Sequence, residues 1–104
     1  MDIRIEHEKK VKTIKIAGNV SLMGIKDLRS LLNDLEGFEE IRIDLANVPY
    51  ADSEFLNLIF GAYKRNPGKK IVLMNPGKFV SDLLDVTRIE QVFEIVRDAP
   101  RPSN

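Results

Sequence analysis

The amino-acid sequence predicts an α/β domain whose mixed sheet has about five strands, with an opening antiparallel hairpin and roughly three to four helices mostly on one face. Three features predict this fold. Alternating apolar and charged residues open the chain, apolar stripes at helical spacing follow, and short apolar runs separate the stripes. Because strands and helices alternate after the hairpin, we expect parallel strands joined by right-handed crossovers.

Length and composition favour one protein-binding domain. With 104 residues the chain can bury a core without metals or disulfides, and we expect a domain over residues 1–97 and a polar, frayed tail over residues 98–104. The 16 basic and 16 acidic residues balance, so nothing steers the chain toward nucleic acid or an anionic membrane. Cysteine is absent and no apolar run suits a signal peptide or a membrane span, so we expect a cytoplasmic protein.

A hairpin, a helix and a strand are predicted in the first half of the chain. Ile3 and Ile5 alternate with charges, residues 7–10 are typical of a turn, and residues 11–17 alternate again. A helix is predicted over residues 25–36, with Gly37 as its C-terminal cap. Its buried stripe comprises Ile25, Leu28, Leu31, Leu32 and Leu35. The next strand spans residues 41–45, and its buried face comprises Ile41, Ile43 and Leu45.

The second half of the chain predicts two more helices and two more strands. The central helix begins at Asp52 or Ser53 and ends before Asn66, because the Asn-Pro-Gly sequence there cannot continue a helix. Residues 70–74 form a continuous apolar run, which is typical of an interior strand, and residues 92–96 form the last strand. A third helix follows Gly77, and its predicted core face comprises Phe79, Val80, Leu83, Leu84 and Val86.

The central helix carries the candidate site. Either Asp52 or Ser53 can cap it, because side-chain oxygens of both residue types accept hydrogen bonds from the unpaired N–H groups of a first turn. Its apolar residues cover an arc of about 200°, which is wider than a surface helix needs. We therefore expect either a wholly buried helix or an exposed flank that a partner covers. Those residues are Phe55, Leu56, Leu58, Ile59, Phe60, Ala62 and Tyr63.

The sequence resembles the STAS domain, a family named for sulfate transporters and anti-sigma factor antagonists. The resemblance covers nearly the whole chain. It rests on the run Asp44-Leu45-Ala46-Asn47-Val48, on Asp52-Ser53 with the apolar helix, and on the run Ile71-Val72-Leu73-Met74-Asn75-Pro76. It continues through Val80, Leu83, Leu84 and Ile89 to Val92-Phe93-Glu94-Ile95.

This resemblance implies a phosphorylation switch. In bacterial anti-sigma factor antagonists, a serine after an aspartate at this place is phosphorylated by the partner, an anti-sigma factor that is an ATP-dependent serine kinase. The unphosphorylated antagonist binds that kinase and frees the sigma factor, which regulates transcription. Ser53 is the matching position. The partner-binding residues implied are Asp52, Ser53, Glu54, Phe55, Asn57 and Leu58, with no cofactor.

Two departures from the family pattern leave alternatives open. A small residue and then glycine commonly follow the serine, whereas Glu54 and Phe55 follow it here. The loop after the hairpin commonly carries an acidic residue, and here it reads Val20-Ser21-Leu22-Met23, so no catalytic or nucleotide role is assigned to Ser21. The alternatives are a STAS-like adaptor or scaffold in a signalling or transport assembly, with Ser53 only a helix cap, and a nucleotide-binding domain that uses the helix start as an anion site.

Signals for an enzyme or a metal site are weak, so we expect neither. Asp44 and Asp52 both fall near the carboxyl end of the strand predicted over residues 41–45, where a carboxylate pair can bind Mg²⁺ or act as acid and base, but no third group of matching type is visible. His7 is the only histidine and falls in a charged segment. Residues 9–12 are predicted to be a solvated end of the hairpin.

Overall fold

Five strands form one mixed sheet in which sequence order and spatial order are the same. The computed structural model of the chain describes residues 2–20, 24–88 and 92–97. The first two strands pair antiparallel and every later neighbour pairs parallel. This confirms the predicted α/β fold with its opening hairpin. The strands are β1 (Asp2–Glu8), β2 (Val11–Ala17), β3 (Glu40–Asn47), β4 (Lys70–Met74) and β5 (Glu94–Val96).

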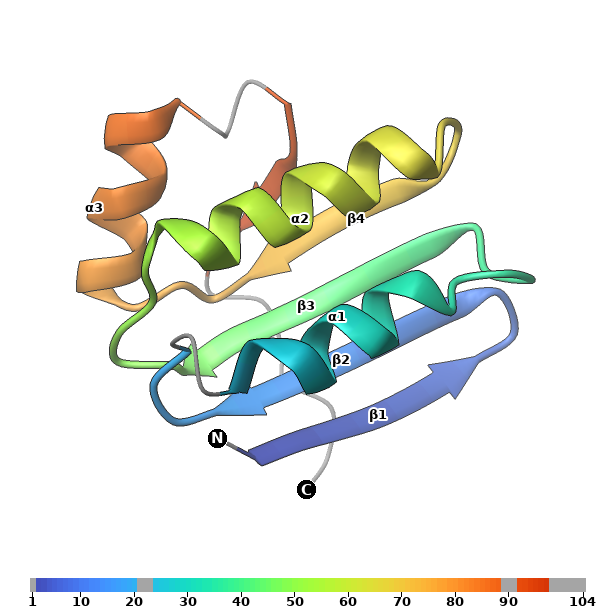
Figure 1. Cartoon of the computed structure of the whole chain (residues 1–104), viewed down its shortest axis with the longest axis horizontal. Helices are drawn as coiled ribbons and strands as arrows, with labels where there is room; N and C mark the ends of the chain where they lie inside the picture. The colour runs from blue at the N-terminus through green and yellow to red at the C-terminus, as the bar shows by residue number, and fades with distance from the viewer. Residues whose placement is uncertain (1, 21–23, 89–91, 98–104) are drawn as a thin grey trace.

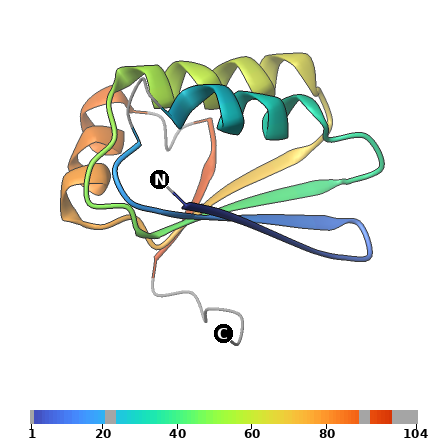
Figure 2. The same ribbon diagram turned by 60° about the horizontal axis from the view of Figure 1, so that its bottom comes forward.

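Each of the three helices in the described part of the chain joins one parallel strand to the next: α1 (Ile25–Asn33), α2 (Ser53–Arg65) and α3 (Lys78–Thr87). Because every crossover advances by one strand in the same direction, right-handed connections place the helices on the same face of the sheet. Figure 1 shows α2 between α1 and α3, and Figure 2 shows α1 and α2 lying over one face of the sheet. Within the described residues, no helix covers the opposite face of the sheet.

The core lies between the sheet and the helices. Alternate residues of the central strands point to the helices and are fully buried, and each such side chain stabilises the fold by about 1.5–3 kcal/mol relative to leaving it exposed. They meet Leu28 and Leu32 of α1 and Phe55 and Ile59 of α2 in one cluster. The buried face predicted for the third strand is thereby confirmed. The strand residues of this cluster include Ile14, Ile41, Ile43, Leu45 and Leu73.

The hairpin turn is shorter than the sequence predicts. Glu8 pairs with Val11, so only Lys9 and Lys10 form the turn, and Lys9 adopts the left-handed conformation with φ 56°. His7 therefore lies within β1 and not in the turn. Its ring is 5.8 Å from that of Phe38, centroid to centroid.

Helix α1 ends at Asn33, which is earlier than predicted, and Lys12 provides a hydrogen-bond donor for the carbonyl of its C-cap residue, Asp34. The Lys12 Nζ donates a hydrogen bond of 2.9 Å to the backbone carbonyl of Asp34 and lies 5.6 Å from the centre of the Phe38 ring. Lysine side chains near a helix C-terminus stabilise carbonyls that have no N–H partner. Lys12 is only 5% exposed, so the prediction of a fully solvated hairpin end is wrong for this residue.

The core face of α3 is narrower than predicted. Val80 and Leu84 are fully buried, whereas Phe79 is 51% exposed and Val86 is 82% exposed. The sheet and α2 contact only the side of the helix that holds Val80 and Leu84, so the prediction was wrong for Phe79 and Val86. The last strand is also shorter than predicted, and its three residues begin at Glu94. Ser21 and residues 98–104 lie outside the described residues.

Candidate functional site

The loop before α2 is fixed to another loop of the chain. The backbone N–H of Val20 donates a 2.9 Å hydrogen bond to the Tyr50 carbonyl, and Val20 and Ala51 form an isolated parallel bridge. Both Val20 and Ala51 are buried. The start of α2 is therefore held in place by the segment that follows β2.

Asp52, not Ser53, caps the central helix. Asp52 has an extended backbone, and its carboxylate accepts a 3.1 Å hydrogen bond from the backbone N–H of Glu54. Ser53 is then the first residue of the helix, and its side chain is exposed. Of the two possible caps, the structure selects the aspartate and leaves the serine hydroxyl at the surface, where another protein can reach it.

Most of the wide apolar arc of α2 is covered by the protein itself. Phe55 and Ile59 are 0% exposed, Leu56 is 6% exposed and Leu58 is 7% exposed. The exposed remainder is Tyr63, whose ring packs edge-on against Phe93 at a centroid distance of 5.4 Å. The structure is thus closer to the buried-helix expectation than to an exposed apolar flank.

The burial pattern divides the predicted partner-binding residues into two groups. Ser53, Glu54 and Asn57 are exposed and Asp52 is half-buried, so these four lie at the surface around the start of α2. Phe55 and Leu58 both belong to the buried core, with Phe55 fully enclosed and Leu58 7% exposed. As a correction to the predicted set, Phe55 supports the surface from beneath and has no side-chain atoms available to a partner.

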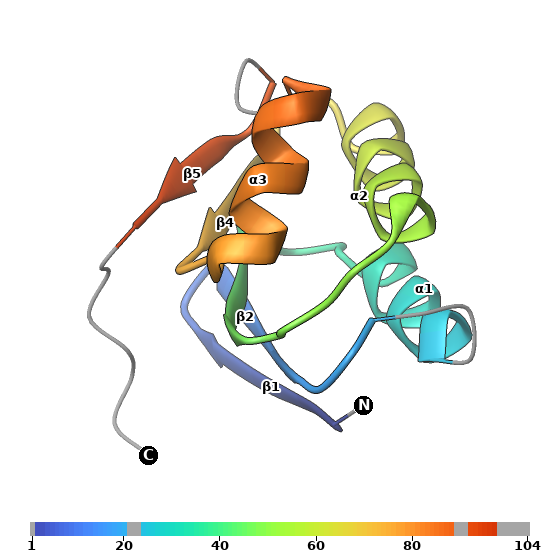
Figure 3. The same cartoon turned by 90° about the vertical axis from the view of Figure 1, so that its left-hand side faces the viewer.

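Two grooves border the exposed face of α2. The α2–α3 groove has a volume of about 230 Å³ and is lined by Ser53, Leu56, Asn57 and Phe60 of α2 and by Thr87 and Arg88 at the end of α3. The α1–α2 groove, also of about 230 Å³, is lined by Arg29 and Asn33 of α1 and by Glu54, Asn57, Leu58 and Arg65 of α2. Figure 3 shows α3 and α1 on the two sides of α2. Asn57 borders both grooves, whereas Ser53 borders only the first.

An exposed aromatic pair near the same helix start was missed by sequence reasoning. Tyr50 and Phe79 are 42% and 51% exposed, and their ring centroids are 5.1 Å apart. Phe79 belongs to the first turn of α3, and Tyr50 belongs to the loop that leads into Ser53. The sequence signal was ambiguous, because an apolar residue in a helical stripe is more often buried.

The two aspartates considered for metal or acid–base chemistry are both engaged in local structure. Asp44 accepts a 3.0 Å hydrogen bond from the Ala46 N–H and is 2% exposed, while Asp52 caps α2. Among the described residues, no three His, Cys, Asp or Glu side chains are placed to hold a metal ion. Each of the two carboxylates therefore has a role in local backbone structure.

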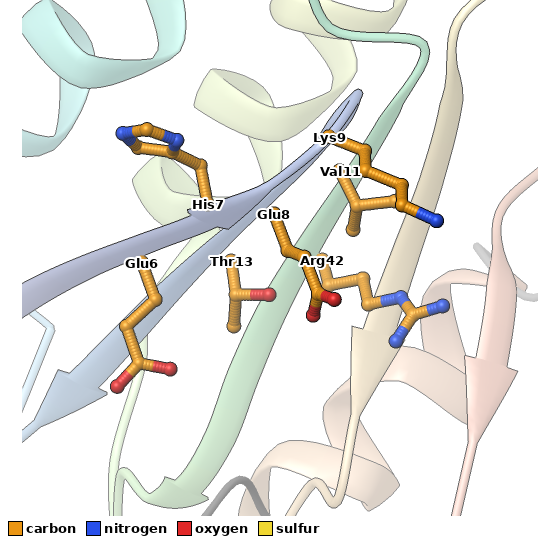
Figure 4. A pocket seen from close by; sticks show the side chains of 7 residues that line it. All are labelled: Glu6, His7, Glu8, Lys9, Val11, Thr13 and Arg42. Atoms are coloured by element: carbon orange, nitrogen blue, oxygen red, sulfur yellow. The ribbon is translucent and has the colours of Figure 1, made fainter.

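A separate hollow lies on the uncovered face of the sheet, near the hairpin turn. Its volume is about 360 Å³, and Figure 4 shows Glu8 and Arg42 pointing into it while His7 points to the other side of the sheet. Charged groups at this face already pair with each other: Lys15 with Glu6 at 3.1 Å, and Arg42 with Glu40. This hollow is at the opposite end of β3 from the start of α2, so it is separate from the Ser53 site.

Comparison of the sequence with known proteins adds two findings. The family model described as "Mlab, STAS domain" matches residues 3–97. An anti-sigma-B factor antagonist of Staphylococcus epidermidis is 24% identical over 86 residues, which are 79% of this chain and 80% of that protein. Within the described residues, no helix is both long and apolar enough to cross a membrane.

Solved structures of anti-sigma factor antagonists have the same fold. One from Mycobacterium paratuberculosis superposes with a TM-score of 0.83 at 14% identity, over 91% of this chain and 84% of that one. The antagonist SpoIIAA in its unphosphorylated form gives a TM-score of 0.77 at 13% identity, over 93% of this chain and 90% of that one. SpoIIAA from Bacillus in its phosphorylated form superposes with a TM-score of 0.73 at 12% identity, over 93% of each chain. At such identities the likeness establishes the fold.

Proposed function

The chain belongs to the STAS domain family, and from that premise we propose that it is a cytoplasmic, non-enzymatic anti-sigma factor antagonist controlled by phosphorylation of Ser53. In this proposal the unphosphorylated protein binds a kinase-type anti-sigma factor and thereby frees a sigma factor for transcription. The kinase transfers the γ-phosphoryl group of ATP to the Ser53 Oγ, the hydroxyl proton passes to a base of the kinase, and ADP is released. The phosphorylated protein then dissociates.

The observation that carries this proposal is the exposed hydroxyl of Ser53 on a helix whose cap is supplied by Asp52. Phosphorylation adds about −1.5 to −2 charge, and the unpaired N–H groups and dipole of a helix start stabilise an anion by about 0.3–1 kcal/mol. Because the serine oxygen is not the cap, a phosphoryl group can be added without removing a hydrogen bond of the helix. The fold is therefore expected to survive the modification.

Association is expected to respond more strongly than folding. A partner that covers Ser53 has to remove water from the phosphoryl group, and burying a charge that is not fully compensated costs several kcal/mol. A loss of about 2.8 kcal/mol already weakens binding a hundredfold. A single phosphorylation is therefore sufficient to release the partner.

The two residues after Ser53, Glu54 and Phe55, leave the serine hydroxyl more accessible to a kinase than the size of a phenylalanine side chain indicates. Phe55 lies in the core, so its ring does not stand beside the hydroxyl. Glu54 remains as an exposed carboxylate next to Ser53. The charge of Glu54, and not the bulk of Phe55, is the feature that a kinase for this site has to accept.

The test combines modification with binding. Incubation with the cognate kinase-type anti-sigma factor and ATP should add one phosphate at Ser53, located by mass spectrometry. Ser53→Asp should weaken the complex at least about tenfold, while Ser53→Ala should bind like the wild type and resist release by ATP. Ser30→Asp, at another exposed helical serine, is the matched control and should bind normally. Absence of phosphate on Ser53, with normal binding by both Ser53 variants, would rule the switch out.

A STAS adaptor without a switch is the second candidate, and the carboxylate of Glu54 directly after the serine favours it. Under that reading Ser53→Asp leaves partner affinity unchanged. A nucleotide-binding domain has less support, because the strand order never reverses and so provides no switch-point crevice of the kind where open α/β sheets bind ligands. A thermal shift scan with ATP, ADP and GTP tests it, and a flat result removes it.

A further inference from the structure

Arg88 and Ser53 face the same groove from two different helices. Ser53 begins α2, and Arg88 is the residue that ends α3, 35 positions later in the chain. Both line the α2–α3 groove, as does Asn57, one helical turn after Ser53. A group of phosphoryl size attached to the serine oxygen therefore has a cation and an amide on the walls of the groove that it enters.

The guanidinium of Arg88 is available to such a group. Arg88 is exposed, and its side chain makes no hydrogen bond or ion pair with any part of the chain that the structure describes. The nearby acid of α3, Asp85, is paired with Arg97 at 3.6 Å. Thr87 is an unsuitable donor because its hydroxyl already bonds to the carbonyls of Leu83 and Leu84, at 3.0 Å and 3.1 Å. Arg88 is thus the cation of this groove with no competing partner among the described residues.

The groove also suits arginine in particular. A guanidinium presents parallel N–H donors that match two phosphate oxygens, which gives a stronger contact than a point charge. Apolar side chains of Leu56 and Phe60 form part of the wall and lower the local dielectric, which strengthens a charge pair placed beside them. Glu54, the acid adjacent to Ser53, lines the α1–α2 groove instead and so does not stand between Ser53 and Arg88.

We propose that Arg88, assisted by Asn57, binds the phosphoryl group of phosphorylated Ser53 and so ties the start of α2 to the end of α3. This inference rests on the proposed phosphorylation of Ser53. Its consequence is regulatory. The phosphoryl group fills the α2–α3 groove and withdraws Arg88 from the surface, so that a partner loses both the groove and its cation in one event.

The experiment uses the full chain with phosphoserine inserted at position 53 during translation, so that no kinase is required. Phosphorus NMR measures the second pKa of the phosphoserine in this protein and in its Arg88→Gln, Arg88→Lys and Arg29→Gln variants. Arg29 is the matched control, because it is an exposed arginine of the groove on the other side of α2. Amide hydrogen exchange at the end of α3 is measured in the same samples.

We expect the pKa of the phosphoserine to be lower in the wild type than in Arg88→Gln by at least about 0.5–1 unit, because a unit charge about 4 Å away produces a shift of this size even at the dielectric constant of water. Arg88→Lys should keep part of this shift, and Arg29→Gln should keep all of it. Phosphorylation should slow exchange of the last α3 amides in the wild type but not in Arg88→Gln. A merely structural arginine would not produce this pattern.

Two results would overturn the proposal. One is that the phosphoserine has the same second pKa in the folded wild type and in the folded Arg88→Gln variant. The other is a pKa that rises with Arg29→Gln and not with Arg88→Gln, which would place the phosphoryl group in the α1–α2 groove. Neither depends on a kinase. If no anti-sigma factor phosphorylates Ser53, the proposed function fails while the contact with Arg88 is still measured directly.

Discussion

The carboxylate of Asp52 accepts a hydrogen bond of 3.1 Å from the backbone N–H of Glu54. Ser53 lies between these two residues in the sequence and is the first residue of α2. Capping and modification are therefore assigned to two adjacent side chains. The helix start is stabilised by the aspartate, and the serine hydroxyl is left for another use.

This division predicts different costs for two neighbouring substitutions. Asp52→Ala should lower the free energy of unfolding by about 1 kcal/mol, because an N-cap acceptor is lost. Ser53→Ala should change it by less than about 0.5 kcal/mol, because an exposed residue away from such features contributes little. Urea unfolding of both variants measures the difference. A loss for Ser53→Ala that equals the loss for Asp52→Ala would show that the serine is also a cap.

Substitution of Phe55 is predicted to lower the stability of the fold, and substitution of Asn57 is predicted to weaken partner binding. Phe55→Ala should cost about 3–5 kcal/mol of folding free energy, because it opens a cavity at a fully buried position. Asn57→Ala, at an exposed position between the two grooves, should cost less than about 0.5 kcal/mol and should weaken partner binding. Thermal unfolding and a binding titration on both variants provide the test. Normal binding by Asn57→Ala would exclude this residue from the interface.

The fold could be predicted because its signals are local. The alternation through Ile41, Ile43 and Leu45 fixes which side of β3 is buried, and the turn at Asn66 fixes where α2 ends. The end of α1 could not be predicted in the same way. Lys12 of β2 donates a hydrogen bond to the carbonyl of Asp34, the C-cap of α1, from 22 positions earlier in the sequence, and no local pattern indicates that contact.

The surface around the candidate site was predictable only in part. Asp52 and Ser53 have a helix-start signature, so their location was evident. The five apolar positions of α3 span an arc of about 160°, and helical periodicity does not decide which edge of that arc meets the sheet. Phe79 therefore remained indistinguishable from a core residue. Arg88 is typical of the basic residues that end helices, so its place beside Ser53 required the tertiary structure.

The aromatic pair of Tyr50 and Phe79 should contribute to binding more than to stability. Because Phe79 is 51% exposed, Phe79→Ala should cost no more than about 1.5 kcal/mol of folding free energy. If the partner covers the start of α2, the same variant should lose affinity by about tenfold, as exposed aromatic anchors commonly do. Val86→Ala, an 82% exposed apolar residue of the same helix, is the control. Equal affinities for the two variants would place the interface elsewhere.

Arg88 should be a residue that lowers the stability of the unmodified protein. Its backbone is left-handed, with φ 56°, a conformation that costs a residue with a Cβ roughly 1–2 kcal/mol and glycine little. After allowance for the greater freedom of glycine in the unfolded chain, Arg88→Gly should raise the free energy of unfolding by about 0.5–1 kcal/mol. The control is Thr87→Gly, one residue earlier within α3. It should lower that free energy by about 0.3 kcal/mol through helix propensity, and further because the Thr87 hydroxyl loses its hydrogen bonds to the Leu83 and Leu84 carbonyls.

Urea unfolding of the unphosphorylated variants measures both effects. A stability gain in Arg88→Gly, together with loss of the phosphoserine pKa shift, is the result expected if the side chain is present for the phosphoryl group. A stability loss in Arg88→Gly would mean that the guanidinium already makes contacts that stabilise the unmodified fold. The arginine would then have a structural reason to occupy a position where glycine is otherwise preferred.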